Sequence, residues 1–169
     1  MARSQRIVLD VGVGTNTSYP FRPKVTIDCT PVFMDIEKPP PELRGWSWVV
    51  GDAQYLPFRN SCFNGVIASH VLEHLENPQR FIWESWRVLK AGGYLELSLP
   101  NFLSINARRD PSHKHIFNAL SLALMLKRQG FTVCFEHSAG SLLPKPLRKA
   151  LIVIMNLLAE EIRLRGVKP

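Results

Sequence analysis

Short apolar runs recur along the chain and predict strands. Six of them are rich in Val, Ile, Leu or aromatic residues, and most are flanked by Gly, Pro or Asn. They are 6–11 (RIVLDV), 24–29 (KVTIDC), 46–53 (WSWVVGDA), 64–70 (NGVIASH), 93–100 (GYLELSLP) and 131–137 (FTVCFEH). Several lack a strict alternation of apolar and polar residues, which is typical of strands buried on both faces of a sheet.

Helical patterns lie between and after the later strands. In 77–93 (NPQRFIWESWRVLKAGG), Asn77 is the expected N-cap and Pro78 the first helical residue. A second helix is expected over 118–130 and a third over 147–166, whose middle is apolar nearly all round. Strands alternating with helices predict an α/β fold, Rossmann-like and doubly wound, with a mainly parallel sheet and helices on both faces.

The first part of the chain interrupts this alternation. Between Gly14 and Asp28 the sequence has two prolines and no amphipathic period, so a loop is expected and the first helix is shortened or missing. The next segment, 30–45 (TPVFMDIEKPPPELRG), contains four prolines and is also expected to be mostly irregular.

Length and composition fit one globular domain. A chain of 169 residues, 46% hydrophobic and 21% charged, is long enough for one core, so we expect a single domain over 1–169. No apolar run approaches the roughly 20 residues of a membrane span, and Asp10 interrupts the first run too early for a secretory leader. Cys29, Cys62 and Cys134 lack the spacing of a zinc site or disulfide framework. These features predict a cytoplasmic protein.

The charge is basic, with 21 Lys and Arg against 14 Asp and Glu. Much of the excess lies in the loop 106–115 (NARRDPSHKH) and in 163–169 (RLRGVKP). A net charge of +7 favours a polyanionic partner such as RNA, although a basic solvated surface would look the same. The apolar C-terminal helix could be buried in this domain, in a protein partner or on a membrane surface, and a homodimer is left open.

Polar and small residues mark the predicted strand ends, where ligands bind in an open parallel sheet. They are Asp10, Gly12 and Gly14 after the first strand, Asp28 after the second, Asp52 and Ala53 after the third, and Ser69 and His70 after the fourth. Glycines admit a close backbone approach, an acid on the next strand can accept both ribose hydroxyls, and an acid beside a small residue can bind an adenine. Together they predict a nucleoside pocket.

Two kinds of nucleoside cofactor compete for such a pocket. A dinucleotide needs a helix N-terminus directly after the glycines, and this chain has Asn16 and two prolines there, which counts against a nicotinamide-dependent oxidoreductase. Asp10, just before the first glycine, suits a ligand with a cationic amine. S-adenosylmethionine combines an adenosine with such an amino acid.

The sequence also resembles a known family. The stretches LDVGVG (9–14) and DAQYLPFRNSCFNGVIASHVLEHLENPQRFIWESWRVLKAGG (52–93) resemble the class I S-adenosylmethionine-dependent methyltransferases of the DAxxLPF, HVLEH and RVLKPGG type. The resemblance spans roughly 7–101, and 110–131 (DPSHKHIFNALSLALMLKRQGF) resembles a later family segment. The chain departs from the family in its short link after the glycines, in FNG for FD and in KAGG for KPGG.

The resemblance implies S-adenosylmethionine as cofactor and assigns the strand-end residues. Asp10, Gly12 and Gly14 would line the methionine side, Asp28 would bind the ribose, Asp52 and Ala53 would face the adenine, and Ser69 and His70 would close the site. Residues 1–101 would form the cofactor-binding part and 102–169 the acceptor side.

The acceptor cannot be named from the sequence. His113 and His115 are the candidates for a catalytic base, although both could simply belong to a solvated surface. No metal is expected, because His70 and His74 have no third ligand in the sequence nearby. The alternative function is a non-catalytic module of the same fold that binds a protein or RNA.

Overall fold

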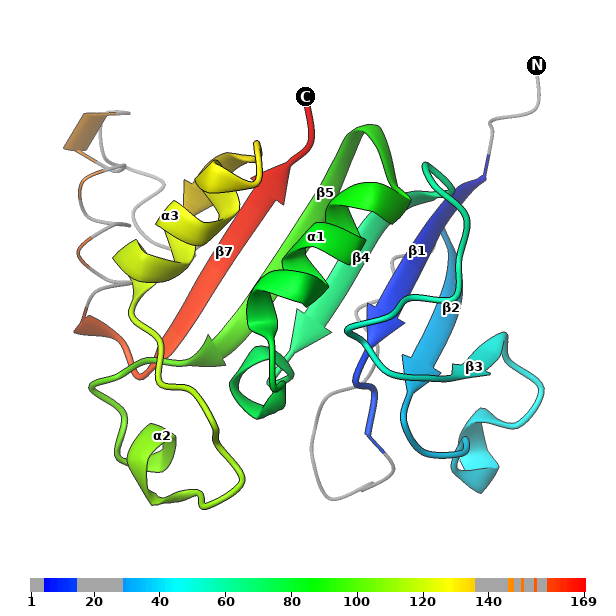
Figure 1. Cartoon of the computed structure of the whole chain (residues 1–169), viewed down its shortest axis with the longest axis horizontal. Helices are drawn as coiled ribbons and strands as arrows, with labels where there is room; N and C mark the ends of the chain where they lie inside the picture. Colours follow the sequence, from blue (N-terminus) through cyan, green and yellow to red (C-terminus); the bar gives the residue numbers. More distant parts are fainter. Residues whose placement is uncertain (1–4, 15–28, 136–145, 148–149, 151–153, 155–157) are drawn as a thin grey trace.

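The protein is described by a computed structural model over residues 5–14, 29–135, 146–147, 150, 154 and 158–169. Within these residues the strands form one sheet in the order β3-β2-β1-β4-β5-β7-β6 (Figure 1). The strands are β1 (Arg6–Val11), β2 (Cys29–Asp35), β3 (Trp48–Val50), β4 (Phe63–Ser69), β5 (Leu89–Pro100), β6 (Thr132–Phe135) and β7 (Glu161–Val167). β1 to β5 run parallel to one another, and β7 runs antiparallel between β5 and β6.

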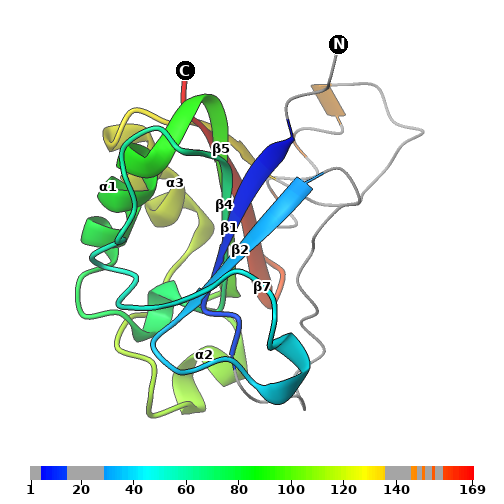
Figure 2. The same ribbon diagram turned by 90° about the vertical axis from the view of Figure 1, so that its right-hand side faces the viewer.

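Two helices, α1 (Pro78–Val88) and α3 (Ala119–Arg128), cover the same face of the sheet (Figure 2). Both begin at the predicted residues. The Asn77 side chain accepts a hydrogen bond from the backbone N–H of Arg80 at 3.1 Å, and Asn118 forms a capping box with Ser121. Short helical elements, η1 (Pro41–Leu43), η2 (Leu72–His74) and α2 (Ile105–Arg109), lie at the edge where the parallel strands end (Figure 1).

The core lies between the sheet and these helices. Phe81, Ile82 and Val88 of α1 are fully buried, as are Leu122 and Leu126 of α3. Together with the buried Ser85, these residues fall on one side of each helix, and that side faces the strands. The mainly parallel α/β architecture predicted from the sequence is confirmed.

The second strand differs from the prediction. The segment 30–45 was expected to be mostly irregular, yet Thr30–Asp35 belongs to β2, which begins at Cys29. Pro31 is tolerated because β3 pairs with Phe33–Asp35, so among the described strands this part of β2 has only β1 beside it. The shortened or missing first helix and Asp28 lie outside the described residues.

The end of the chain also corrects the sequence analysis. Pro146, Leu147, Ala150, Ile154 and Leu158 are helical, but the helix expected over 147–166 does not extend to its predicted end, because β7 begins at Glu161. Alternate residues of β7, including Ile162 and Leu164, are buried between its neighbours.

The predicted junction of α1 and the next strand is displaced. The helix was expected to continue toward Gly92, but it ends at Val88, and β5 begins directly at Leu89.

Candidate functional site

The parallel strands end at one edge of the sheet, and a cleft of about 420 Å³ opens there. Its lining comes from the ends of β1 to β4 and from η2 with the turn after it. The lining residues are Val11, Gly12, Asp35, Ile36, Gly51, Asp52, Ala53, Gln54, His70, Val71, His74, Leu75, Glu76 and Lys114. The cleft therefore has the position that a nucleotide pocket takes in an open parallel sheet.

The glycine turn after β1 is joined to the end of β2. Gly12 and Gly14 have φ angles of +72° and +75°, which favour glycine. The Gly12 N–H donates to the carbonyl of Met34 at 2.8 Å, and the Gly14 N–H donates to Asp35 Oδ2 at 2.8 Å. Asp35 is thus the acid that ends β2 and faces the glycine turn.

One side of the cleft is built by a tight turn after β3. Asp52 Oδ1 accepts a hydrogen bond from the Gln54 N–H at 2.8 Å, and Ala53 is buried. The Gln54 side chain in turn accepts from the Asn77 N–H at 2.7 Å, which ties this turn to the start of α1.

A buried ion pair holds the loop that follows. Arg87 pairs with Glu84 at 2.6 Å and donates to the carbonyls of Leu56 and Phe58 at 2.9 and 2.7 Å. Glu84 also accepts from the Leu56 N–H at 3.1 Å. The LPF and RVLK segments of the sequence are therefore joined through one arginine.

The chain after β4 turns sharply at His70, whose φ is +55°. Such an angle is uncommon outside glycine and brings the imidazole of His70 to the wall of the cleft. Its Nδ1 lies 3.3 Å from Oε1 of Glu73, which is buried, and its Nε2 lies 3.8 Å from Oε1 of Glu161.

The loop 110–117 packs against η2 and closes one side of the cleft. The backbone N–H groups of Lys114 and His115 both donate to the carbonyl of Glu73, at 2.7 and 3.2 Å. The Lys114 ammonium pairs with Glu76 at 2.7 Å, and this pairing lowers the pKa of the Glu76 carboxyl. The two stretches that resemble HVLEH and DPxHxH thus meet in space.

A second cavity, of about 610 Å³, adjoins the cleft. It is lined by His70, Pro100, Ser104, Arg109, Asp110, Pro111, His113, Glu160 and Glu161. His70 lines both spaces, so the two spaces adjoin at its side chain. Charged and imidazole groups predominate in this second lining. Hydrogen bonds from Ser112 lower the pKa of Asp110 at its rim.

The structure brings together four of the predicted cofactor residues in the cleft lining: Gly12, Asp52, Ala53 and His70. Gly14 joins them through Asp35, while Asp10 lies within β1 and Ser69 ends β4 beside the cleft.

Sequence reasoning missed Asp35, Gln54, Glu76 and Lys114. Asp35 could have been found, because it lies 21 residues after Gly14, close to the roughly 20-residue spacing of an acid that binds a ribose.

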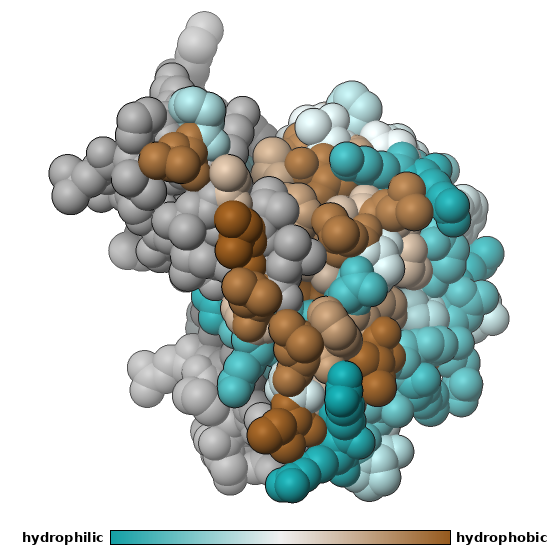
Figure 3. Space-filling model, turned by 90° about the vertical axis from the view of Figure 1, so that its left-hand side faces the viewer, coloured by the Kyte–Doolittle hydropathy of each residue, from teal (hydrophilic) through white to brown (hydrophobic). Residues whose placement is uncertain are grey.

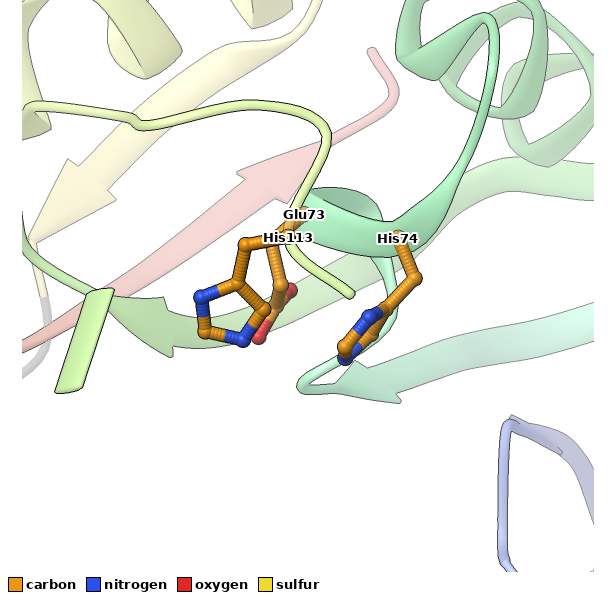
Figure 4. A group of neighbouring side chains, drawn as sticks. All are labelled: Glu73, His74 and His113. Atoms are coloured by element: carbon orange, nitrogen blue, oxygen red, sulfur yellow. The ribbon is translucent and has the colours of Figure 1, made fainter. Parts of the chain in front are cut away.

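The two residues predicted as catalytic bases, His113 and His115, lie in different places relative to the two spaces. His113 lines the second cavity, whereas His115 lines neither space, and its Nε2 lies 3.3 Å from the carbonyl of Glu76. The argument that His74 has no third metal ligand nearby holds only along the sequence. In the folded chain, ligand atoms of Glu73, His74 and His113 all lie within 4.8 Å of one another (Figure 4).

An open parallel sheet with a glycine turn and acids at its carboxyl edge defines a Rossmann-like nucleotide-binding domain. Residues 9–97, more than half of the chain, match the family model described as a methyltransferase domain. The chain belongs to this family, and the predicted resemblance is confirmed.

Individual relatives agree with this assignment. The chain is 33% identical over 98 residues to a probable S-adenosylmethionine-dependent methyltransferase of Mycolicibacterium smegmatis, covering 53% of this chain and 38% of that protein. It is 43% identical over 58 residues to a ubiquinone/menaquinone biosynthesis C-methyltransferase of a Ruegeria species, covering 32% of this chain and 23% of that one. The chain thus spans less than half the length of these relatives.

Two solved structures share the fold across nearly the whole chain. The YcgJ protein of Bacillus subtilis has a TM-score of 0.70 at 18% identity, covering 98% of this chain and 93% of that one. A putative methyltransferase of Haloferax volcanii, solved in complex with the Trm112 methyltransferase activator, has a TM-score of 0.70 at 17% identity, covering 98% and 83%. In the described part of this chain, none of the helices has the length and apolar character to cross a membrane.

Proposed function

We propose that this domain is a methyltransferase that binds S-adenosylmethionine in the cleft and transfers its methyl group to an acceptor in the second cavity. The observation that carries the proposal is that His70 lines both the cleft and the second cavity, which would place a bound cofactor next to a bound acceptor. The family, and the similarity to a probable S-adenosylmethionine-dependent methyltransferase of Mycolicibacterium, support the same chemistry.

The cofactor is positioned by the carboxyl edge of the sheet. Asp10, Gly12 and Gly14 lie on the methionine side, Asp52 and Ala53 face the adenine, and Ser69 and His70 close the site. Asp35 takes the ribose role assigned from the sequence to Asp28, because it ends β2 and contacts the glycine turn. A carboxylate there can accept both ribose hydroxyls.

The reaction needs alignment more than activation by the protein. A sulfonium already carries a good leaving group, so the cofactor brings the difficult chemistry. The domain contributes by holding acceptor and methyl group in line and by excluding water. For an acceptor that must lose a proton, His113 is better placed than His115, because it lines the second cavity.

The acceptor is polar where it enters the domain. Arg109, Asp110, Glu160 and Glu161 line the second cavity, and such side chains recognise hydroxyl, amine or carboxylate groups better than a purely apolar body. Burial alone would raise the pKa of Glu161, but hydrogen bonds from Ser98 and Arg163 hold it below its usual value. Glu161 is therefore ionised near neutral pH.

Calorimetry with S-adenosylmethionine tests the cofactor site. The wild-type chain should bind, and Asp35→Asn should weaken binding roughly 10- to 100-fold, the effect of losing hydrogen bonds to a charged group. Glu37→Gln is the matched control, because Glu37 carries the same charge two residues away and does not line the cleft. Absence of binding by the wild-type chain, or equal affinity of both variants, would contradict the proposal.

A partner is proposed on two observations. Arg108 and Arg109 are exposed in the basic loop 106–115, and the helical residues Leu147, Ile154 and Leu158 are exposed apolar side chains. The Haloferax neighbour was solved with an activator protein. An RNA or protein could bind through this loop and the C-terminal helical residues, and size-exclusion chromatography with light scattering would separate this from a homodimer.

A further inference from the structure

Glu73, His74 and His113 meet at the boundary between the two spaces. Glu73 and His74 belong to η2, whereas His113 comes from the loop 110–117 almost forty residues later. Figure 4 shows the two imidazoles and the carboxylate on the same side of these segments. One ligand atom of each side chain lies within 4.8 Å of those of the other two.

The carboxylate of Glu73 is buried, and burial of a charge is energetically unfavourable without a compensating group. Its side chain is only 2% exposed, and neither oxygen accepts a hydrogen bond from the residues that the structure describes. Nδ1 of His70 lies 3.3 Å from its Oε1. A buried carboxylate is costly unless a positive group compensates it.

Both imidazoles are held through Nδ1. His74 Nδ1 lies 3.2 Å from the carbonyl of Ser112, and His113 Nδ1 lies 3.1 Å from the carbonyl of Ala107. Because a carbonyl can only accept, each Nδ1 donates to it, which leaves Nε2 as the nitrogen that can bind a metal ion; Nε2 of His113 also lies 3.7 Å from Oδ2 of Asp110. This is how histidines that bind a metal are usually oriented by the residues behind them.

We propose that Glu73, His74 and His113 bind a divalent transition-metal ion such as zinc. Two imidazoles and one carboxylate suit such ions better than magnesium or calcium. Metal–ligand bonds of about 2.0–2.2 Å require ligand atoms roughly 3.3–3.6 Å apart, so a pair at the 4.8 Å limit must close by roughly 1.2–1.5 Å. The side chains would have to make this adjustment on binding while each Nδ1 keeps its carbonyl partner.

Three protein ligands leave a coordination position open. Because His74 lines the cleft and His113 lines the second cavity, this position faces the place where the two spaces adjoin. An acceptor with an oxygen donor, such as a hydroxyl or carboxylate, would occupy it. The ion site rests on the three side chains alone, whereas this acceptor class rests on the proposed function.

Metal binding and base catalysis would both use the same atom, Nε2 of His113. A base needs the free lone pair of His113 Nε2, and a metal ligand uses that same pair. With an ion bound, the ion would lower the pKa of the acceptor oxygen, and the proton would pass to water instead of to His113. The two roles of His113 are therefore distinguishable by metal removal.

The test uses the full chain without a histidine tag, stripped with a chelator and titrated with Co²⁺ and then Zn²⁺. We expect one ion per chain, visible Co²⁺ absorption bands, and their loss when Zn²⁺ is added. His113→Ala should weaken binding by at least about tenfold, judged by the loss typical of disturbed metal sites. Glu73→Gln should do the same.

His115→Ala is the matched control, because it removes an imidazole from the same loop outside the cluster. If Glu73→Gln does not fold, as judged by circular dichroism, His113→Ala alone decides the question. The proposal is overturned if the wild-type chain binds neither ion, or if His115→Ala loses as much affinity as His113→Ala.

Calorimetry with S-adenosylmethionine on the stripped protein separates this proposal from the previous one. Cofactor binding without ion binding would reject the metal site and leave the proposed function standing. Ion binding without cofactor binding would do the reverse.

Discussion

Replacing Gly12 with alanine tests how tightly the glycine turn packs against the mouth of the cleft. A Cβ at Gly12 would lie 2.3 Å from Cγ2 of Val71, a distance that real Cβ atoms do not tolerate. Gly14 offers a matched control. Its φ of +75° is almost the same as the +72° of Gly12, and no described atom lies within 4 Å of the Cβ that alanine would add.

The two substitutions therefore separate backbone strain from overlap. Both place an alanine in the left-handed region, which costs about 1–2 kcal/mol. Gly12→Ala must in addition displace the buried Val71, and crowding of this kind costs about 1–3 kcal/mol. We expect a loss of unfolding free energy of about 1–2 kcal/mol for Gly14→Ala and about 2–5 kcal/mol for Gly12→Ala.

Urea unfolding followed by circular dichroism measures this difference, provided that the slope with urea is unchanged. Adding Val71→Ala to Gly12→Ala removes the overlapping methyl group and should recover most of the excess loss in a double-mutant cycle. Equal destabilisation by Gly12→Ala and Gly14→Ala, or an additive double mutant, would refute the reasoning.

Two further predictions concern ionised groups. Arg87→Met leaves the buried Glu84 without its closest cation and should cost about 3–5 kcal/mol, whereas Arg80→Met, whose side chain is 41% exposed at 3.5 Å from Glu84, should cost about 0–1 kcal/mol. Urea unfolding measures both losses of unfolding free energy, and similar losses for Arg87→Met and Arg80→Met would contradict this prediction. Glu161 has a pKa below its ordinary 4.5, so its contribution is present above that pH and is lost as the pH falls further. Acid unfolding should therefore be less steep in Glu161→Gln than in the wild type, and identical curves would contradict it.

Most of the parallel sheet could be predicted from apolar runs, because its strands are buried and end in turn-forming residues. The second strand was missed, since Pro31 and the later prolines outweighed the apolar run at Val32–Met34 in the assignment. Pro31 fits in β2 because β3 is short and pairs with only the end of β2. This pairing is a property of the folded sheet and is not visible in the local sequence. As a result, the acid at the end of β2 was assigned to Asp28 instead of Asp35.

The last strand was missed for a different reason. Glu161 and Arg165 are spaced four apart, as in an ion pair on a helix, but Arg165 pairs with Glu96 of β5 at 2.8 Å. The alternation of Ile162, Leu164 and Gly166 with polar residues was a strand signal that competed with it. The Glu73, His74 and His113 cluster could not be predicted, because its members come from two segments that meet only through the docked loop.

The position of β7 in the sheet also determines when the sheet can be completed during synthesis. β6 leaves the ribosome before β7, yet β7 is its only neighbour in the described sheet, and β7 also covers the side of β5 that faces away from β4. Until residues 161–167 emerge, β6 has no strand to pair with and β5 presents an open edge. A nascent chain halted before Glu161 would therefore be open to pairing with other chains through β5, and it becomes protected when this late segment inserts between two earlier ones.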